Sequence, residues 1–119
     1  MAVLPGTELT YADLAGMDDN QLIMSLKDGH NDALVVLFDR YHRVVFSIAF
    51  GIVHDRGEAE DVLQTVFLDI FRSAMSFDTT KETARVWPVQ YAHHCAISRK
   101  ESLQNLGSFV EEKSAKQRD

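Results

Sequence analysis

Residues 58–74 read EAEDVLQTVFLDIFRSA, and this stretch decides the fold. Its apolar residues recur at steps of three and four, which is the spacing of one buried face of an α-helix. That face consists of Ala59, Val62, Leu63, Val66, Phe67, Ile70, Phe71 and Ala74. Acidic residues occupy the first turn, where the helix dipole favours negative charge. The stretch therefore predicts a helix with one face in a hydrophobic core.

The other face of this helix is a narrow strip of mostly polar residues. By the 3.6-residue helical period, the strip consists of Asp61, Gln64, Thr65, Leu68 and Arg72. Leu68 is the exception, because it is apolar and lies among polar neighbours. It is either a contact for another protein or one of the single exposed leucines that are common on protein surfaces. Spacing alone leaves both interpretations open.

Two more helices are predicted before this one. Asp18 and Gln21 have the spacing of a capping box, which predicts a helix over about residues 19–28. Asn31 is a candidate N-cap for a longer helix, whose apolar residues recur as far as His54. Apolar residues cover several faces of that helix, so we expect it to be central, with neighbours on more than one side.

A further helix is predicted over residues 87–104, after a polar connector at residues 76–85. Within a helix, proline is well tolerated only in the first turn. Pro88 therefore indicates that this helix begins at residue 87 or 88 or is kinked there. Gly107 is expected to end it, because glycine commonly follows the last helical residue.

Length and composition indicate one globular domain. The chain has 119 residues, of which 45% are hydrophobic and 25% charged, enough for a single core. Strand alternation and internal repeats are lacking, so we predict an all-α fold, a single bundle of about four helices over residues 18–106. Residues 1–17 would be a leader with at most a short helical turn. Residues 107–119 would be a charged tail or the start of a linker.

Charge is distributed unevenly along the chain. Residues 1–80 carry five basic and thirteen acidic side chains, whereas residues 81–119 carry seven basic and five acidic ones, for a net charge of −6. An acidic chain argues against nonspecific coating of nucleic acid. The asymmetry suggests two surfaces with different partners.

Nothing in the sequence points to a membrane. The longest charge-free apolar run, residues 44–53, is far shorter than the roughly 20 residues that span a bilayer. The single cysteine excludes a disulfide framework and suits a reducing compartment. We therefore expect a cytoplasmic protein with no membrane partner.

The densest group of potential metal ligands is His93-His94-Cys95. Neighbouring residues on a helix point about 100° apart, so these three cannot all face one ion. The sequence has no HExxH or CxxC spacing and no glycine-rich phosphate loop. Cys95 lacks an identifiable base partner and is typical of a small core residue. We expect no metal site, no cofactor and no enzymatic activity.

Aromatic and cationic residues are mixed in the last third of the chain. They are Phe77, Lys81, Arg85, Trp87, Tyr91, His93, His94, Arg99 and Lys100. Aromatic rings can stack on unpaired bases, while lysine and arginine can hold phosphates. Alternatively the aromatic residues belong to the core, and Arg99 and Lys100 form a solvated face near a helix end, where cations are favoured.

Several motifs occur in an order that resembles region 2 of a bacterial sigma factor of the sigma-70 family. They are Asp39-Arg40-Tyr41, Ala59-Glu60-Asp61-Val62-Leu63-Gln64-Thr65-Val66-Phe67, Phe77-Asp78, Trp87 and Ala96-Ile97. The extracytoplasmic-function (ECF) type is the most similar, and the resemblance runs from about residue 18 to residue 103. The second motif is the specific part.

The resemblance implies a subunit of RNA polymerase that recognises promoters. In this family one helical face docks on the clamp helices in the largest subunit of core RNA polymerase. Carried over by motif, the docking residues here are Asp61, Gln64, Thr65 and Leu68. All four lie on the polar strip defined above, so the helical period and the resemblance indicate the same face of this helix.

The resemblance also implies contacts with promoter DNA. The last helix of the family and the loop before it read the minus-ten element and hold the non-template strand, with one base flipped out. That implied set is Phe77, Thr80, Lys81, Arg85, His93, His94, Ser98, Arg99 and Lys100. Flipping a base costs a few kcal/mol of unstacking, which these contacts must offset.

The sequence departs from the family pattern at four positions. Pro88 replaces a usual leucine, His94 an asparagine, Ser98 an aspartate and Thr65 a glutamate. These changes affect base recognition more than polymerase docking. Region four, which reads the minus-thirty-five element, does not follow. We therefore also consider an excised or truncated domain, and a sigma-like module that binds an anti-sigma factor or the polymerase without reading DNA.

Overall fold

The computed structural model describes residues 9–78 and 83–117, with side chains to residue 107. This part of the chain forms α1 (Tyr11–Ala15), α2 (Asp19–Lys27), α3 (Asp32–Val53), α4 (Arg56–Ala74), the 3₁₀ turn η1 (Ala84–Val86) and α5 (Trp87–Gln117). The described residues contain no strand, so the all-α prediction is confirmed. Four of the helices correspond to predicted ones, and α1 is a short helix within residues 1–17 whose Leu14 is completely buried in the core.

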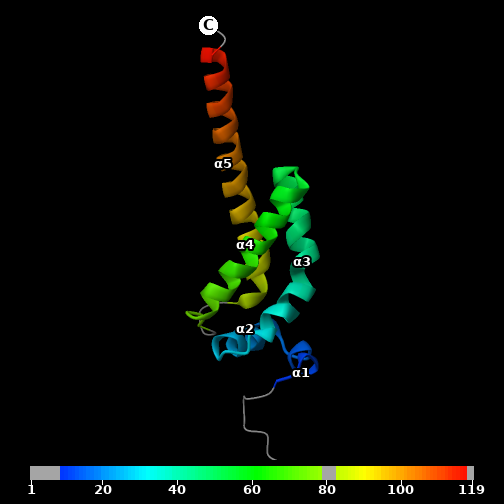
Figure 1. Ribbon diagram of the computed structural model, residues 1–119. Helices are drawn as coiled ribbons and strands as arrows, with labels where there is room; N and C mark the ends of the chain where they lie inside the picture. Colours follow the sequence, from blue (N-terminus) through cyan, green and yellow to red (C-terminus); the bar gives the residue numbers. More distant parts are fainter. Residues whose placement is uncertain (1–8, 79–82, 118–119) are drawn as a thin grey trace, which may run out of the picture.

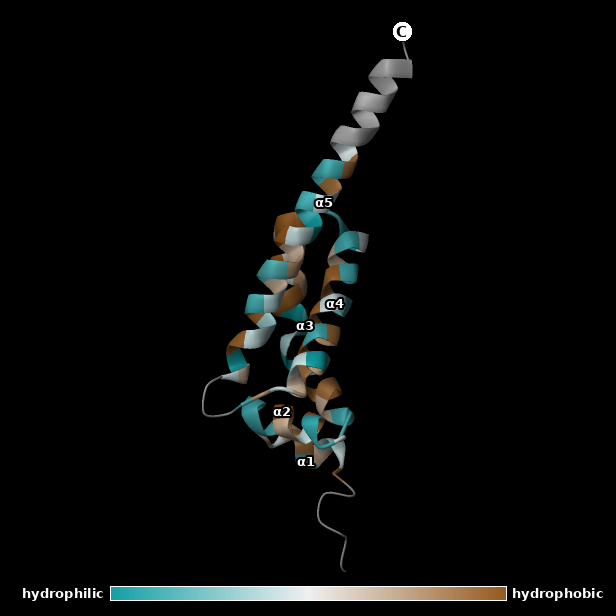
Figure 2. Ribbon diagram, turned by 90° about the vertical axis from the view of Figure 1, so that its left-hand side faces the viewer, coloured by the Kyte–Doolittle hydropathy of each residue, from teal (hydrophilic) through white to brown (hydrophobic). Residues whose placement is uncertain are grey.

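Three long helices form the body of the bundle. In Figure 1, α3, α4 and α5 lie together, while α1 and α2 close one end. Leu26 of α2, Val45 of α3 and Val66 of α4 are completely buried between them. The contact face of α5 contains Ala92 and Ala96, also completely buried, and these small residues let the helix approach its neighbours closely. Figure 2 shows apolar and polar residues interspersed along the coloured parts of α3, α4 and α5, which is consistent with helices that have one face in the core.

The first turn of α2 is capped as the sequence predicts. The Asp18 carboxylate accepts a hydrogen bond from the Gln21 amide at 2.8 Å, and the Gln21 side chain accepts one from the Asp18 amide at 2.9 Å. Asn31 is at the N-cap position of α3 as predicted, but its side chain does not cap the helix. Asn31 has helical backbone angles, φ −62° and ψ −23°, and its side chain makes no capping bond. An N-cap residue whose side chain accepts from the second or third amide of the helix typically has an extended backbone.

These two caps provide a matched test of stability. We expect Asp18→Ala to lower the free energy of unfolding by about 1 kcal/mol, because the Gln21 amide loses its acceptor. Asn31→Ala removes no bond and should change it by less than about 0.5 kcal/mol. Urea denaturation followed by circular dichroism measures both values. Equal losses in the two variants would contradict the capping assignment.

A tight corner joins α3 to α4. His54 ends α3 in the left-handed conformation, with φ 55°, and Asp55 caps α4 by accepting from the Glu58 amide at 2.9 Å. The predicted end of α3 at His54 is thereby confirmed. The corner sets the rotation of α4, whose buried residues are those predicted from spacing except that Leu63 and Phe71 are half-buried.

The start of α5 agrees with the sequence, but its end does not. Trp87 is the first residue of the helix and Pro88 lies in the first turn. The predicted end at Gly107 is wrong, because α5 continues to Gln117 and projects beyond the bundle in Figure 1. Gly107 does not have the positive φ of a terminating glycine. A helical glycine costs only about 1 kcal/mol, which the turns around it can offset.

Within the described ranges, no helix combines the length and the apolarity needed to cross a membrane.

Candidate functional site

The polar strip of α4 is exposed, as its spacing predicts. Asp61, Gln64, Thr65 and Leu68 all face solvent, opposite the buried face of the helix. Leu68 has 51% of its surface exposed. The Thr65 hydroxyl donates to the Asp61 carbonyl at 3.0 Å, one turn earlier. The strip thus combines one carboxylate, one amide and one apolar side chain on a single helical face.

Arg99 of α5, which belongs to the predicted DNA-binding set, contacts acidic residues of α4, one of which belongs to the predicted polymerase-binding set. Its guanidinium forms an ion pair with Glu58 and a second one with Asp61, at 3.1 Å in the latter case. The hydrogen bond to Glu58 is the main reason why the pKa of Arg99 lies above its ordinary value. An arginine expected to meet DNA is therefore bound to a carboxylate expected to meet the polymerase.

A groove of about 320 Å³ lies beside this ion pair, between α4 and α5. Asp61, Thr65 and Asp69 line it from α4, and His94, Ser98 and Arg99 are among the residues that line it from α5. His93 is exposed but does not line this groove, and Lys100 borders a different hollow beside the end of α3. The predicted DNA residues of α5 therefore do not all line one groove.

The predicted DNA residues that precede α5 differ in their exposure. Only 3% of the Phe77 surface is exposed, and its ring lies nearly perpendicular to that of Trp87, with 5.1 Å between the centroids. It offers no free face on which a base can stack, contrary to the role implied by the resemblance. Arg85 is exposed beside α2 and α3. Thr80 and Lys81 lie outside the described residues.

Cys95 is half-buried, and its thiol donates to the Asp69 carboxylate at 3.4 Å. Burial first, and Asp69 second, raise the pKa of this thiol to about 11. A thiol with such a pKa is protonated at neutral pH and is a poor nucleophile. In the part of the chain that the structure describes, no three His, Cys, Asp or Glu residues are placed to hold a metal ion.

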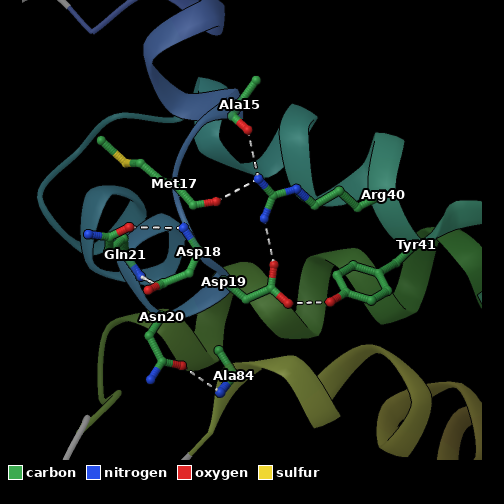
Figure 3. A network of polar contacts seen from close by, with 9 residues as sticks. All are labelled: Ala15, Met17, Asp18, Asp19, Asn20, Gln21, Arg40, Tyr41 and Ala84. Carbon is green, nitrogen blue, oxygen red and sulfur yellow. Dashed lines mark hydrogen bonds and ion pairs between the residues drawn. The ribbon is translucent and has the colours of Figure 1, made fainter.

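A polar network connects α1, α2 and α3 (Figure 3). The Arg40 guanidinium donates to the Asp19 carboxylate at 2.8 Å and to the carbonyls of Ala15 and Met17 at 3.0 and 2.6 Å. The Tyr41 hydroxyl donates to the other oxygen of Asp19. Burial, followed by the bond to Asp19, raises the pKa of Tyr41 to about 12.

The same region contains a residue that sequence reasoning missed. The Asn20 side chain accepts a hydrogen bond from the Ala84 amide at 2.9 Å, across 64 positions of sequence. Glu58 was interpreted only as a first-turn acid, and its pairing with Arg99 was also missed. No local pattern signals such contacts, because each depends on how distant helices pack.

The sequence profile of Sigma-70 region 2 matches residues 37–105 of this chain. The ECF RNA polymerase sigma factor SigK of Mycobacterium ulcerans (strain Agy99) is 28% identical over 82 residues, which are 69% of this chain and 44% of that protein. SigK of Mycobacterium bovis (strain BCG / Pasteur 1173P2) is 31% identical over 72 residues, which are 60% and 38% of the two chains.

This chain therefore spans less than half the length of the curated relatives it matches. No solved structure matches it significantly. The matched profile covers more than half of the chain, including all of α4 and the first half of α5. The chain belongs to the sigma-70 family and corresponds to its region 2.

Proposed function

We propose that this chain acts as a sigma-factor domain in transcription initiation. It binds core RNA polymerase through Asp61, Gln64, Thr65 and Leu68 of α4, and the clamp helices of the largest subunit are the docking partner. It catalyses no reaction itself and works in the cytoplasm, where the polymerase is. The observation that carries the proposal is the exposed strip of α4, which lies opposite the core face within the matched region.

The proposal includes contacts with the minus-ten element of the promoter. The non-template strand lies near η1, where Arg85 is exposed, and along α5, where His93, His94 and Lys100 are exposed. Cations and aromatic groups of this kind hold phosphates and stack on bases. Because the whole chain is acidic, strand binding follows docking on the polymerase and does not occur on free DNA.

A second candidate function is a sigma-like module that binds protein only, either the polymerase or an anti-sigma factor. Two observations favour it. Phe77 is buried against Trp87, and Arg99 is already paired with two carboxylates. Both residues belong to the set that the resemblance assigns to DNA, and neither is free to reach a strand in this conformation.

One assay in two stages separates these functions. Labelled chain is first titrated with purified core RNA polymerase, and a single-stranded minus-ten oligonucleotide is then titrated into the complex. We expect the complex to form and to bind the strand, and His94→Ala to weaken strand binding about fivefold by removing a contact to the base or phosphate. Docking without any strand binding would favour the protein-only module. No docking by a folded chain would refute the sigma-factor domain and would leave, of the protein-only module, only the form that binds an anti-sigma factor.

A further inference from the structure

Helix α2 contacts both flanks of the segment that connects α4 to α5. At its first turn, Asn20 accepts from the Ala84 amide at 2.9 Å. At its last residue, the Lys27 ammonium donates to the Phe77 carbonyl at 3.5 Å. Phe77 follows α4, and Ala84 begins the turn η1 that leads into α5. The two ends of the connection are thus held by the two ends of one short helix.

The bond from Asn20 satisfies a donor that would otherwise have no partner. Ala84 is the first residue of η1 and only 3% of its surface is exposed. The first amide of a helical turn has no acceptor within that turn. A buried amide without a partner costs about 1–3 kcal/mol. The side-chain oxygen of Asn20 is the acceptor for this amide, so the position of η1 depends on Asn20.

Asn20 is itself held firmly. Its neighbour Asp19 is fixed to α3 by Arg40 and Tyr41, and Asp18 caps α2 (Figure 3). The amide oxygen of Asn20 therefore has a fixed position relative to α3. Through Ala84, the start of α5 takes its position from α3 as well.

We propose that Asn20 is a positioning residue for promoter binding, which rests on the function proposed above. It fixes η1 so that Arg85 faces the pocket of about 430 Å³ that Asn20, Tyr41 and Thr83 also line. Arg85 belongs to the set assigned to DNA, whereas Asn20 acts through the backbone of η1. Without the Asn20 bond, η1 moves among several positions and the strand loses a preformed surface.

Three substitutions in the full chain test this role. Asn20→Leu keeps a similar volume and removes the acceptor, whereas Asn20→Asp keeps an acceptor oxygen. Asn31→Leu is the matched control, because Asn31 is exposed and its side chain makes no capping bond. Each variant is assayed for amide hydrogen exchange at Ala84, for affinity to core RNA polymerase and for strand affinity within that complex.

We expect Asn20→Leu to accelerate exchange at Ala84 by at least about fivefold and to lower strand affinity about fivefold to tenfold, which is the effect of one lost hydrogen bond. Polymerase affinity should stay within about twofold, because the α4 strip does not depend on η1. Asn20→Asp should restore both exchange and strand affinity to near the wild-type values. Asn31→Leu should change none of the three.

Each contrary result has its own meaning. Unchanged exchange at Ala84 would refute the fixing of η1 by Asn20. Faster exchange with unchanged strand affinity would refute a positioning role in promoter binding. Equal losses of polymerase and strand affinity would assign Asn20 a general structural role and overturn the proposal. A wild-type complex that binds no strand would refute the proposed promoter function, and the exchange data would still decide whether Asn20 fixes η1.

Discussion

Asp61→Arg is expected to weaken binding to core RNA polymerase by about a hundredfold, or about 3 kcal/mol. The proposed docking strip on α4 contains one carboxylate, and reversing its charge would turn an attraction to a cation of the polymerase into a repulsion. The fold should survive, because 58% of the Asp61 side chain is exposed and exposed ion pairs contribute little to stability. Titration of labelled chain with core polymerase measures the loss.

Two control variants make this experiment specific. Glu60→Arg reverses a charge on the neighbouring residue of the same helix, outside the strip, where it removes only an exposed pair with Arg56. It has the same effect on net charge and should leave polymerase affinity within about threefold. Arg99→Met removes the intramolecular partner of Asp61 without altering the strip. If Glu60→Arg weakens docking as much as Asp61→Arg, the effect is one of net charge and the assignment of the strip is wrong.

Arg40→Met is expected to destabilise the fold by about 3 kcal/mol and to lower the melting temperature by about 15 °C. The Asp19 side chain is only 10% exposed, so the loss of Arg40 leaves a nearly buried carboxylate without its ion pair. The carbonyls of Ala15 and Met17 lose a donor in the same substitution. The nearly buried carboxylate of Asp19 accounts for most of the cost, because water cannot fully replace its partner.

Arg43→Met is the matched control for that loss. Arg43 is exposed on the same helix, three residues further on, and makes no ion pair with another described residue. Its replacement should change stability by less than about 0.5 kcal/mol. Thermal and urea unfolding of both variants measure the difference. Equal stability of the two variants would show that the Asp19 network contributes nothing to holding α1 and α2 on α3.

Local sequence signals predicted the helices well. The capping box of Asp18 and Gln21 and the apolar stripe of residues 58–74 depend on neighbours within one or two turns, so they can be read without knowing the fold. Asn31 and Gly107 show the limits of such signals. Each is a residue type that often marks a helix end, but Asn31 has helical backbone angles and Gly107 lies within α5, so residue type alone does not determine where a helix is capped or ends.

The candidate site was predicted less completely, because its chemistry depends on contacts between distant segments. The exposed strip followed from the period of α4 alone. The pairing of Arg99 with Glu58 and Asp61 joins α5 to α4, and spacing within either helix does not reveal it. The resemblance assigns Phe77 to DNA, whereas in the structure its ring is buried against Trp87, the first residue of α5.

The ion pairs of Arg99 make the two proposed surfaces thermodynamically linked. A cation from the polymerase that binds Asp61 competes with Arg99, and a phosphate that binds Arg99 releases Asp61. By reciprocity, each event changes the equilibrium constant of the other by the same factor. Because the Arg99 side chain is 41% exposed, that factor is no more than about five. Docking and strand binding would then assist one another modestly, and the assistance would fade as added salt screens the pair.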